Sequence, residues 1–480
     1  MNDMILILNF SDEFAVEAAK RLRAEHIYCR IISGMTTASQ IKEIAPRGIL
    51  MAGEVRSGTG VFDAEILRLN IPVLAMGHAA HMLLAAQGGA SAGVAISERK
   101  AMIQYDKSAL FTGLPGGERY VAEALTLMLP PDVRMTASAA GCTIAFENTQ
   151  ARQYGVQFEP ERNDPESSMI LTNFARDICG CNAWWTIDAA VHEAQTALEE
   201  AAERGGYAIC AVSGGVDSTL ASVLTYKAFG ERMTAIFVDT GLMREGEAEW
   251  VKRMYGKLGI PLLYVDRSDV VLEALAGKCG MGEKTEVVMH CLHEEIIAQA
   301  AAMPDANTLV LGSHYSDYLH SGVRHDDWKR CGLNVIEPLQ MLFKREVLDA
   351  AEMLGVSQEV FSKKSFPSLG LGARIVGEVT HERLLAMRTA EAIFRDEVRG
   401  AGLNRKLHKY FPVFAGSAGF QNGEMVVLRA VTLSGGQLTP ARLPYDLVER
   451  TVARIMAESP IVARVFYDQT PTMVGKETFA

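Results

Sequence analysis

The chain has 480 residues, of which 49% are hydrophobic and 22% charged, and its formal net charge is −11. This length exceeds what one hydrophobic core supports and predicts two to four domains of about 100–200 residues each. The negative charge and the absence of a long Lys/Arg run argue against a wide nucleic-acid interface. No apolar stretch reaches the roughly 18 residues that a bilayer crossing needs.

The N-terminus and the cysteines indicate a cytoplasmic protein. An acid precedes a short apolar run at residues 4–8, with no basic segment and no cleavage site, which is typical of a first strand and not of a signal peptide. The eight cysteines are scattered, and Cys179 and Cys181 form the only close pair. This spacing favours reduced thiols over disulfides or a zinc site.

Residues 1–178 alternate short apolar segments with amphipathic ones. Because strands and helices that alternate build a sheet covered by helices, we predict an open α/β sheet here. The predicted strands are 4–8, 28–32, 48–52 and 72–76, and the predicted helices are 14–25, 64–69 and 78–86.

Three segments of this region resemble class I glutamine amidotransferases: the run from Gly48 to Gly53, the run from Pro72 to Gly77, and Tyr154-Gly-Val-Gln-Phe-Glu-Pro-Glu161. The resemblance implies a flavodoxin-like domain in which these segments are the oxyanion loop, the nucleophile elbow and the segment that carries the catalytic base.

The reactive positions of that family are changed. Gly77 stands where the family has its cysteine nucleophile, Glu159 stands where it has its histidine, and only Glu161 remains. Since neither glycine nor a carboxylate can perform the acyl transfer of a cysteine, we predict no glutaminase activity. Cys142 does not replace the nucleophile, because the resemblance places it at an ordinary structural cysteine.

A new site formed by His78 or His81 with Glu159 remains an alternative to a domain kept for packing or regulation.

A helix predicted at 187–204 ends at Gly205-Gly206, and a buried strand at 207–212 follows. The strand leads into Ser213-Gly-Gly-Val-Asp-Ser-Thr219 and then into a helix predicted at 220–229. Glycines at the start of a helix let the backbone approach a ligand, and the unpaired N–H groups there attract anions. The loop lacks the Gly-Lys-Ser/Thr ending of a Walker motif.

This loop resembles the pyrophosphate loop of the ATP pyrophosphatases, which form an adenylylated substrate and pyrophosphate. The resemblance implies that the loop holds the pyrophosphate portion of ATP and that Asp217 helps to bind Mg²⁺ and takes part in catalysis. The residues assigned to ATP in this loop are Ser213, Gly214, Gly215, Val216, Asp217 and Ser218.

Further strands predicted at 234–238, 262–265 and 308–312, with a helix at 286–302, complete a doubly wound parallel sheet. Val238 and Asp239 end the first of these strands, where the adenosine of a nucleotide is expected. The run from Phe237 to Arg244 resembles GMP synthetase.

Two later segments, Leu309–Asp317 and Ile336–Val347, also resemble that family. They imply that Ser313 contacts ATP, that Asp317 is a second Mg²⁺ ligand or a contact on the phosphate side, and that Lys344 neutralises the leaving pyrophosphate. The resemblance continues in Phe366–Val379, which implies that Arg374 lies near the acceptor site. Tyr467-Asp468 resembles part of the dimerisation domain of that family.

The resemblance therefore predicts three domains and a homodimer. They are an amidotransferase-like domain at 1–178, an ATP pyrophosphatase domain at 179–370, and a small α+β dimerisation domain at 371–480.

The sequence differs most from GMP synthetase in the segments where that family binds xanthosine monophosphate. The lid of that family has no counterpart in 321–330, Ser368-Leu369 replaces a Gly-Pro pair, and 472–480 differs from the family's chain end. A phosphate or carboxylate remains within reach of scattered basic residues, namely Arg324, Lys329, Arg330, Arg374 and Lys476.

The leading hypothesis is a ligase that uses ATP and Mg²⁺ to adenylylate a nucleotide such as xanthosine monophosphate. Free ammonia, or ammonia from a separate glutaminase, would then displace AMP. One alternative keeps the ATP chemistry with another acceptor, or with a sulfur or amine nucleophile. A second alternative is a nucleotide-binding regulator without turnover.

Overall fold

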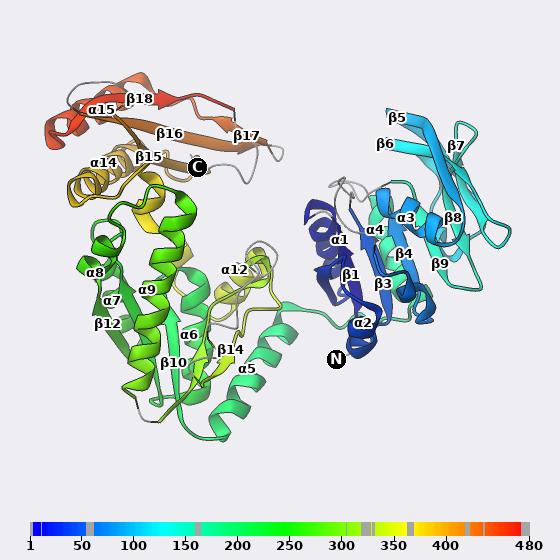
Figure 1. Cartoon of the computed structure of the whole chain (residues 1–480), viewed down its shortest axis with the longest axis horizontal. Helices are drawn as coiled ribbons and strands as arrows, with labels where there is room; N and C mark the ends of the chain where they lie inside the picture. Colours follow the sequence, from blue (N-terminus) through cyan, green and yellow to red (C-terminus); the bar gives the residue numbers. More distant parts are fainter. Residues whose placement is uncertain are drawn as a thin grey trace. The chain divides into compact units, whose positions relative to one another are not determined.

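The computed structural model describes residues 3–10, 12–53, 62–158, 165–303, 305–317, 328, 332–361, 369–417, 423–434 and 437–471. The chain divides into two compact units, Met1–Ala189 and Ala190–Ala480 (Figure 1). The division falls within helix α5 (Ile187–Glu203). The three-domain division made from the sequence stays a prediction.

The first unit contains a nine-stranded sheet in the order β2-β1-β3-β4-β9-β8-β7-β5-β6. Its first five strands are parallel and its last four pair antiparallel. The parallel strands β1, β3 and β4 are almost wholly buried, as expected for strands with helices on both faces. The strands are β1 (Ile5–Asn9), β2 (Cys29–Ser33), β3 (Gly48–Ala52), β4 (Val73–Met76), β5 (Ala90–Tyr105), β6 (Gly117–Met128), β7 (Arg134–Ala139), β8 (Cys142–Asn148) and β9 (Gln153–Val156).

The α/β class predicted for this region is confirmed, and its three predicted helices are present. Helix α1 (Asp12–Ala24) starts two residues before its predicted position, whereas the 3-10 helix η1 (Ala64–Arg68) and α3 (His78–Ala86) start at theirs. Helices α2 (Ala38–Ile44) and α4 (Pro165–Thr172) were not predicted. The antiparallel strands β5 to β8 were not predicted. Register shifts at Ala92/Val94 and Val94/Ile96 interrupt the alternation of side chains in β5, which removes the period-2 signal of a strand.

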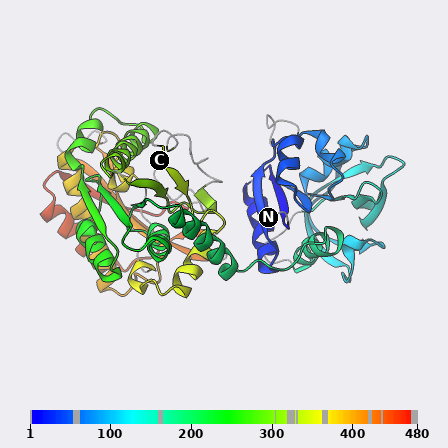
Figure 2. The same ribbon diagram turned by 90° about the horizontal axis from the view of Figure 1, so that it is seen from below.

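The second unit begins with a five-stranded parallel sheet in the order β12-β11-β10-β13-β14, which confirms the doubly wound fold. Its strands are β10 (Tyr207–Val212), β11 (Met233–Asp239), β12 (Leu262–Asp266), β13 (Ala306–Val310) and β14 (Asn334–Ile336). Helices lie on both sides of this sheet (Figure 2). They include α6 (Val216–Phe229), α7 (Glu247–Leu258), α8 (Ser268–Ala274), α9 (Met281–Ala301), α12 (Lys344–Met353) and α13 (Gln358–Phe361).

The strand order reverses at β10. The chain moves from β10 to β11 and β12 on one side, then returns to β13 and β14 on the other. Loops diverge at such a switch point, so the carboxyl ends of β10 and β13 are where a doubly wound fold binds its ligand.

The last part of the second unit is α+β, as predicted. A four-stranded sheet contains β15 (Lys409–Gly416), β16 (Glu424–Ser434), β17 (Gln437–Pro440) and β18 (Val462–Asp468). The 3-10 helix η4 (Gly370–Arg374), α14 (His381–Gly400) and α15 (Tyr445–Glu458) complete it. Buried residues of α14, such as Met387 and Phe394, share one apolar core with Phe414 and Leu428 of the sheet.

Candidate ATP site

Helix α6 begins at Val216, four residues earlier than predicted, with Gly215 as its N-cap. The sequence hid this start because the cap residue has no side chain to bond the first turn. Asp217 and Ser218 therefore lie in the first helical turn, where the unpaired N–H groups and the positive end of the helix dipole attract anions.

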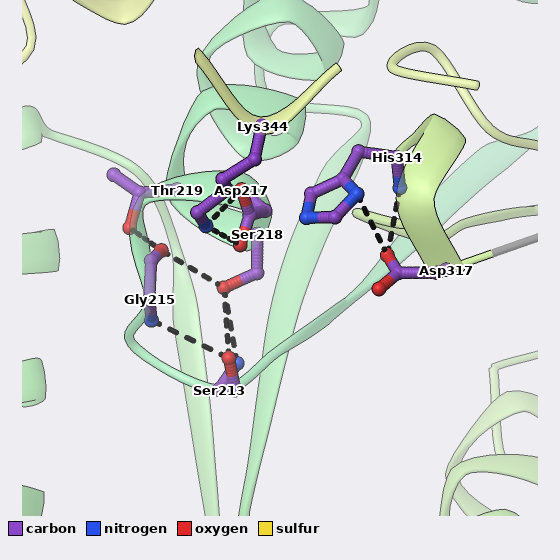
Figure 3. A network of polar contacts seen from close by, with 8 residues as sticks. All are labelled: Ser213, Gly215, Asp217, Ser218, Thr219, His314, Asp317 and Lys344. Carbon is purple, nitrogen blue, oxygen red and sulfur yellow. Dashed lines mark hydrogen bonds and ion pairs between the residues drawn. The ribbon is translucent and has the colours of Figure 1, made fainter. Parts of the chain in front are cut away.

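Serine hydroxyls hold the loop between β10 and α6 in shape. The Ser213 N–H donates to Ser218 Oγ at 3.2 Å, and the Gly215 N–H donates to Ser213 Oγ at 3.3 Å. Ser218 Oγ donates in turn to the Gly215 carbonyl at 3.2 Å (Figure 3). Gly214 has φ +75°, a conformation that glycine adopts without steric cost. The loop is therefore preformed around a tight backbone turn.

Lys344 lies at the first position of α12 and reaches Asp217. Its Nζ donates to both carboxylate oxygens, at 2.7 Å to Oδ1 and 2.6 Å to Oδ2 (Figure 3). The side chains are 44% and 26% exposed, so both remain accessible to a ligand. The structure thus brings together two groups that the sequence places 127 residues apart.

The segment after β13 lies against the same loop. A Cβ built on Gly312 would come within 2.8 Å of the backbone N and Cα of Ser218, so Gly312 lets the two backbones meet. Ser313 follows directly. Asp317 accepts the His314 N–H at 2.9 Å, and its Oδ2 lies 3.4 Å from His314 Nδ1 (Figure 3). Asp217 thus faces Lys344, whereas Asp317 faces His314.

The end of β11 is fixed by its own turn. Asp239 accepts the Gly241 N–H and the Tyr264 hydroxyl, both at 2.9 Å, and Val238 beside it is buried. Burial, followed by the bond to Asp239, raises the pKa of Tyr264. Sequence reasoning missed Tyr264, because nothing near it in the chain marks it as a partner of Asp239.

The structure places Arg374 beside Phe411, with its guanidinium carbon 4.7 Å from the ring centroid. The side chain is 8% exposed. Burial and the nearby charge of Arg244 lower the pKa of Arg374 to about 9, against the opposing effect of Glu391. Its predicted place near the acceptor stays a prediction.

The turn after Asp239 is held by the C-terminal part of the unit. The Leu371 N–H donates to the Leu242 carbonyl at 2.7 Å. Arg388 of α14 donates to the carbonyls of Gly241 and Met243, the latter at 3.0 Å. No sequence signal points to Arg388, which lies 147 residues from Gly241.

The NAD synthase family matches residues 192–385, which include the loop and the parallel sheet. The whole chain is similar to the glutamine-hydrolyzing GMP synthase of Limosilactobacillus reuteri, at 34% identity over 98% of this chain and 96% of that one. It is also 33% identical to the enzyme of Caldanaerobacter subterraneus, over 98% of this chain and 97% of that one. The chain belongs to the GMP synthase family. It is therefore an ATP-dependent ligase that forms AMP and pyrophosphate.

In this GMP synthase family member, a sharp bend lies at Gly77, the position that the sequence resemblance assigns to the nucleophile elbow. Gly77 joins β4 to α3 with φ +63° and ψ −131°, and its N–H donates to the carbonyls of Val156 and Phe158. Elbows of this kind hold a strained residue that exposes the nucleophile. Here the strained position carries no side chain. Glu159 and Glu161 lie outside the described residues.

His78 and His81 follow the bend, with ring centroids 5.6 Å apart. His81 Nδ1 is buried and has no hydrogen-bond partner among the residues that the structure describes. Burial, and then the charge of His78, lower the pKa of His81 to about 4. His81 is thus held neutral in the folded protein.

We expect Gly77→Cys to destabilise the protein by about 1–3 kcal/mol, because a Cβ is strained at this φ and ψ. We also expect it not to release glutamate from glutamine, since the sequence resemblance places Glu159 at the position of the family's histidine base. Thermal unfolding and a glutamate assay measure the two effects. Ala86→Cys, on the exposed end of α3, adds a thiol without the strain and should leave the melting temperature nearly unchanged. Glutamate release by either the natural protein or Gly77→Cys would contradict the prediction.

The low pKa of His81 predicts acid sensitivity. A histidine whose pKa is depressed by folding stabilises the protein fully above its unfolded value of 6.5 and loses this contribution as the pH falls towards 4. We expect a loss of about 1–2 kcal/mol over this window, after reduction for the partial exposure of the ring. His81→Gln should remove this part of the pH dependence in urea unfolding. His78→Gln should shift the window upward in pH, because it removes the repelling charge. An identical profile for His81→Gln and the natural protein would refute the assignment.

Proposed function

We propose that this ligase adenylylates a nucleotide acceptor, with xanthosine monophosphate as the first candidate, and that ammonia not made by its own first unit displaces AMP. The observation that carries this proposal is the Lys344–Asp217 ion pair at the start of α6. It gathers a cation, a carboxylate and the N–H groups of a helix N-terminus at one glycine turn.

The geometry suits the departure of pyrophosphate. The acceptor's carbonyl oxygen attacks the α-phosphorus, the bond from that phosphorus to the bridging oxygen breaks, and pyrophosphate leaves with the charge that develops. Ser213, Ser218 and the α6 N-terminus receive the β and γ phosphates, and Lys344 stabilises the leaving group. Ammonia then attacks the activated carbon, the carbon–oxygen bond to AMP breaks, and the nitrogen loses a proton.

Asp217 and Asp317 fit Mg²⁺ in their chemistry, since carboxylate oxygens are its preferred protein ligands. No cluster of three or more metal-ligating side chains exists in the described part of the chain. One or two carboxylates suit a site that substrate phosphates complete. Mg²⁺, when bound, offsets negative charge on the phosphates. We therefore propose that Asp217 and Asp317 contribute to a site that forms only with ATP.

Gly77 supports a nitrogen source outside this chain. A glutaminase needs a nucleophile at the elbow, and the elbow of this chain has none. Ammonia therefore comes from solution or from a separate glutaminase.

Pyrophosphate release from ATP tests the proposal. The purified protein is assayed with a panel of nucleotides, each with ammonium chloride or with glutamine. We expect release with xanthosine monophosphate and ammonium, but not with glutamine alone. Release only with another acceptor would replace xanthosine monophosphate, and release with none would support a nucleotide-binding regulator.

A different acceptor is the main alternative because of the sequence departures in 321–330, 368–369 and 472–480. Apart from Trp328 and Leu369, these positions lie outside the described residues, as do Arg324, Lys329, Arg330 and Lys476. The choice between acceptors therefore rests on the assay.

A homodimer formed through the C-terminal part belongs to the proposal. Exposed apolar side chains there support it, because association of two copies would remove them from water. Leu433 and Phe466 are each 48% exposed and Tyr445 is 81% exposed. Light scattering of Phe466→Asp, compared with the natural protein, measures whether this surface joins two copies.

A cytoplasmic location is also proposed. Every cysteine in the described part of the chain is a free thiol, and cytoplasmic proteins keep their thiols reduced. None of the described helices combines the length and hydrophobicity that crossing a membrane requires.

A further inference from the structure

A cavity of about 370 Å³ lies between the start of α7, helix α14 and β15. Trp250 of α7 and Tyr410 of β15 contribute aromatic rings to its lining. None of the residues predicted to bind ATP lines it. Its volume falls within the range of small-molecule sites, which is about 300–1,000 Å³.

The cavity is lined by four arginines and four glutamates, and several of these charges already pair. Glu391 is buried and accepts from Arg244 Nε and Arg395 Nη1, both at 2.8 Å. Glu359 lies 3.3 Å from Lys257. One glutamate therefore serves two arginines, and a second has a lysine outside the lining as its partner.

Arg253 of α7 and Arg399 of α14 differ from the other two arginines. Neither forms an ion pair or a hydrogen bond among the residues that the structure describes, and both are exposed. Lys252 is the main group that lowers the pKa of Glu249, and Arg253 contributes a smaller effect through its charge alone. Burial raises the pKa of Tyr410, and the lining charges act on it in both directions: Arg399, Arg244 and Arg395 lower the pKa, whereas Glu391 raises it.

Two further glutamates, Glu245 and Glu247, complete the acidic part of the lining. Glu245 is exposed on the turn before α7, and Glu247 is the first residue of α7, where the helix dipole stabilises its charge. The lining therefore carries as many negative as positive charges, and its two exposed arginines, Arg253 and Arg399, are the cations that an anion can reach.

We propose that this cavity binds a nucleoside 5′-monophosphate, with the phosphate held by Arg253 and Arg399 and the base against Trp250. Guanidinium groups match the oxygens of a phosphate with paired, charge-assisted hydrogen bonds. A planar base gains from packing on an aromatic ring. AMP belongs to this class and is formed by the ligase itself.

The cavity connects to the ATP site through the turn after β11. Arg244 lines the cavity and lies five residues after Asp239, and α14 holds the same turn through Arg388. A ligand that joins α7 to α14 therefore acts on the turn beside the nucleotide. By linkage, ATP and the ligand then change each other's affinity by the same factor.

Calorimetry with AMP tests the site while a non-hydrolysable ATP analogue saturates the loop. We expect one equivalent of AMP to bind to the natural protein. The double variant Arg253→Gln/Arg399→Gln should weaken AMP binding by roughly tenfold or more, because two charge-assisted contacts are lost. Arg405→Gln/Lys406→Gln removes two exposed cations that do not line the cavity and should bind AMP normally.

Binding of the ATP analogue and the thermal melt check that the double variant folds. Trp250→Phe gives a second measurement, since AMP should change the tryptophan fluorescence of the natural protein and not that of this variant. No AMP binding beside the saturating analogue, or equal binding by the double variant, would overturn the proposal. Neither result depends on which acceptor the ligase uses.

Discussion

Lys344→Met should lower the rate of pyrophosphate release by about 10²–10³ fold while ATP binding persists. Removing one group that stabilises transition-state charge costs about this much in enzymes of known mechanism. Lys344 Nζ lies at 2.6 and 2.7 Å from the two oxygens of Asp217, so it is positioned at the turn that receives the phosphates. Charge on the leaving pyrophosphate develops during the reaction, and the loss should therefore fall on the rate more than on affinity.

ATP affinity gives the second measurement. The Lys344 ammonium occupies both oxygens of Asp217 in the resting loop, so a divalent cation that binds there competes with it. Lys344→Met removes this competition and should leave the equilibrium affinity for ATP with Mg²⁺ equal or higher. Arg345→Gln alters the next side chain, which is 81% exposed and pairs with Asp349, and should change neither quantity. An unchanged rate in Lys344→Met would exclude a role for this lysine in the chemistry.

Gly312→Ala is expected to weaken ATP binding by about tenfold or more and to destabilise the protein by about 1–3 kcal/mol. The added Cβ would lie 2.8 Å from the backbone of Ser218 and 3.0 Å from that of Asp217. Backbone atoms cannot rotate away, so the strand end or the first turn of α6 must move. Displacement of that turn misaligns the N–H groups that would receive the phosphates.

Gly256→Ala is the matched control. Gly256 lies inside α7, and a Cβ there meets nothing within 4 Å. Alanine favours a helix over glycine, so this variant should be more stable by up to about 1 kcal/mol, with normal ATP affinity. Equilibrium binding and thermal unfolding of both variants measure the contrast. Normal ATP affinity in Gly312→Ala would show that contact between the two backbones is not needed for the site.

The sequence predicted the elements with strong local patterns. Strand β10 and helix α3 have the predicted bounds, because an apolar run between glycines and an alanine-rich helix are unambiguous locally. The start of α6 was wrong by four residues, since Gly215 caps the helix without a side chain. Strands β5 to β8 were missed because irregular register disrupts their alternation.

In the candidate site, too, contiguous motifs could be predicted from the sequence and long-range contacts could not. The Ser213–Ser218 loop is contiguous, so its motif identified it directly. The contacts of Tyr264 with Asp239 and of Arg388 with the following turn depend on tertiary packing over 25 to 147 residues, which a single sequence does not encode as a pattern. The burial of Arg374 on Phe411 is likewise a product of packing.

The bend at Gly77 limits which substitutions the first unit can accept during evolution. In an active hydrolase the residue at this bend stores conformational energy in order to present its reactive atom, and glycine releases that tension at no steric cost. The bend then turns the chain from β4 into α3, whose Leu83 and Leu84 share a hydrophobic core with β1 and β3. Any other residue at position 77 would bring back the conformational strain without the catalytic base that a nucleophile needs. A single substitution at this position is therefore not expected to restore a working nucleophile.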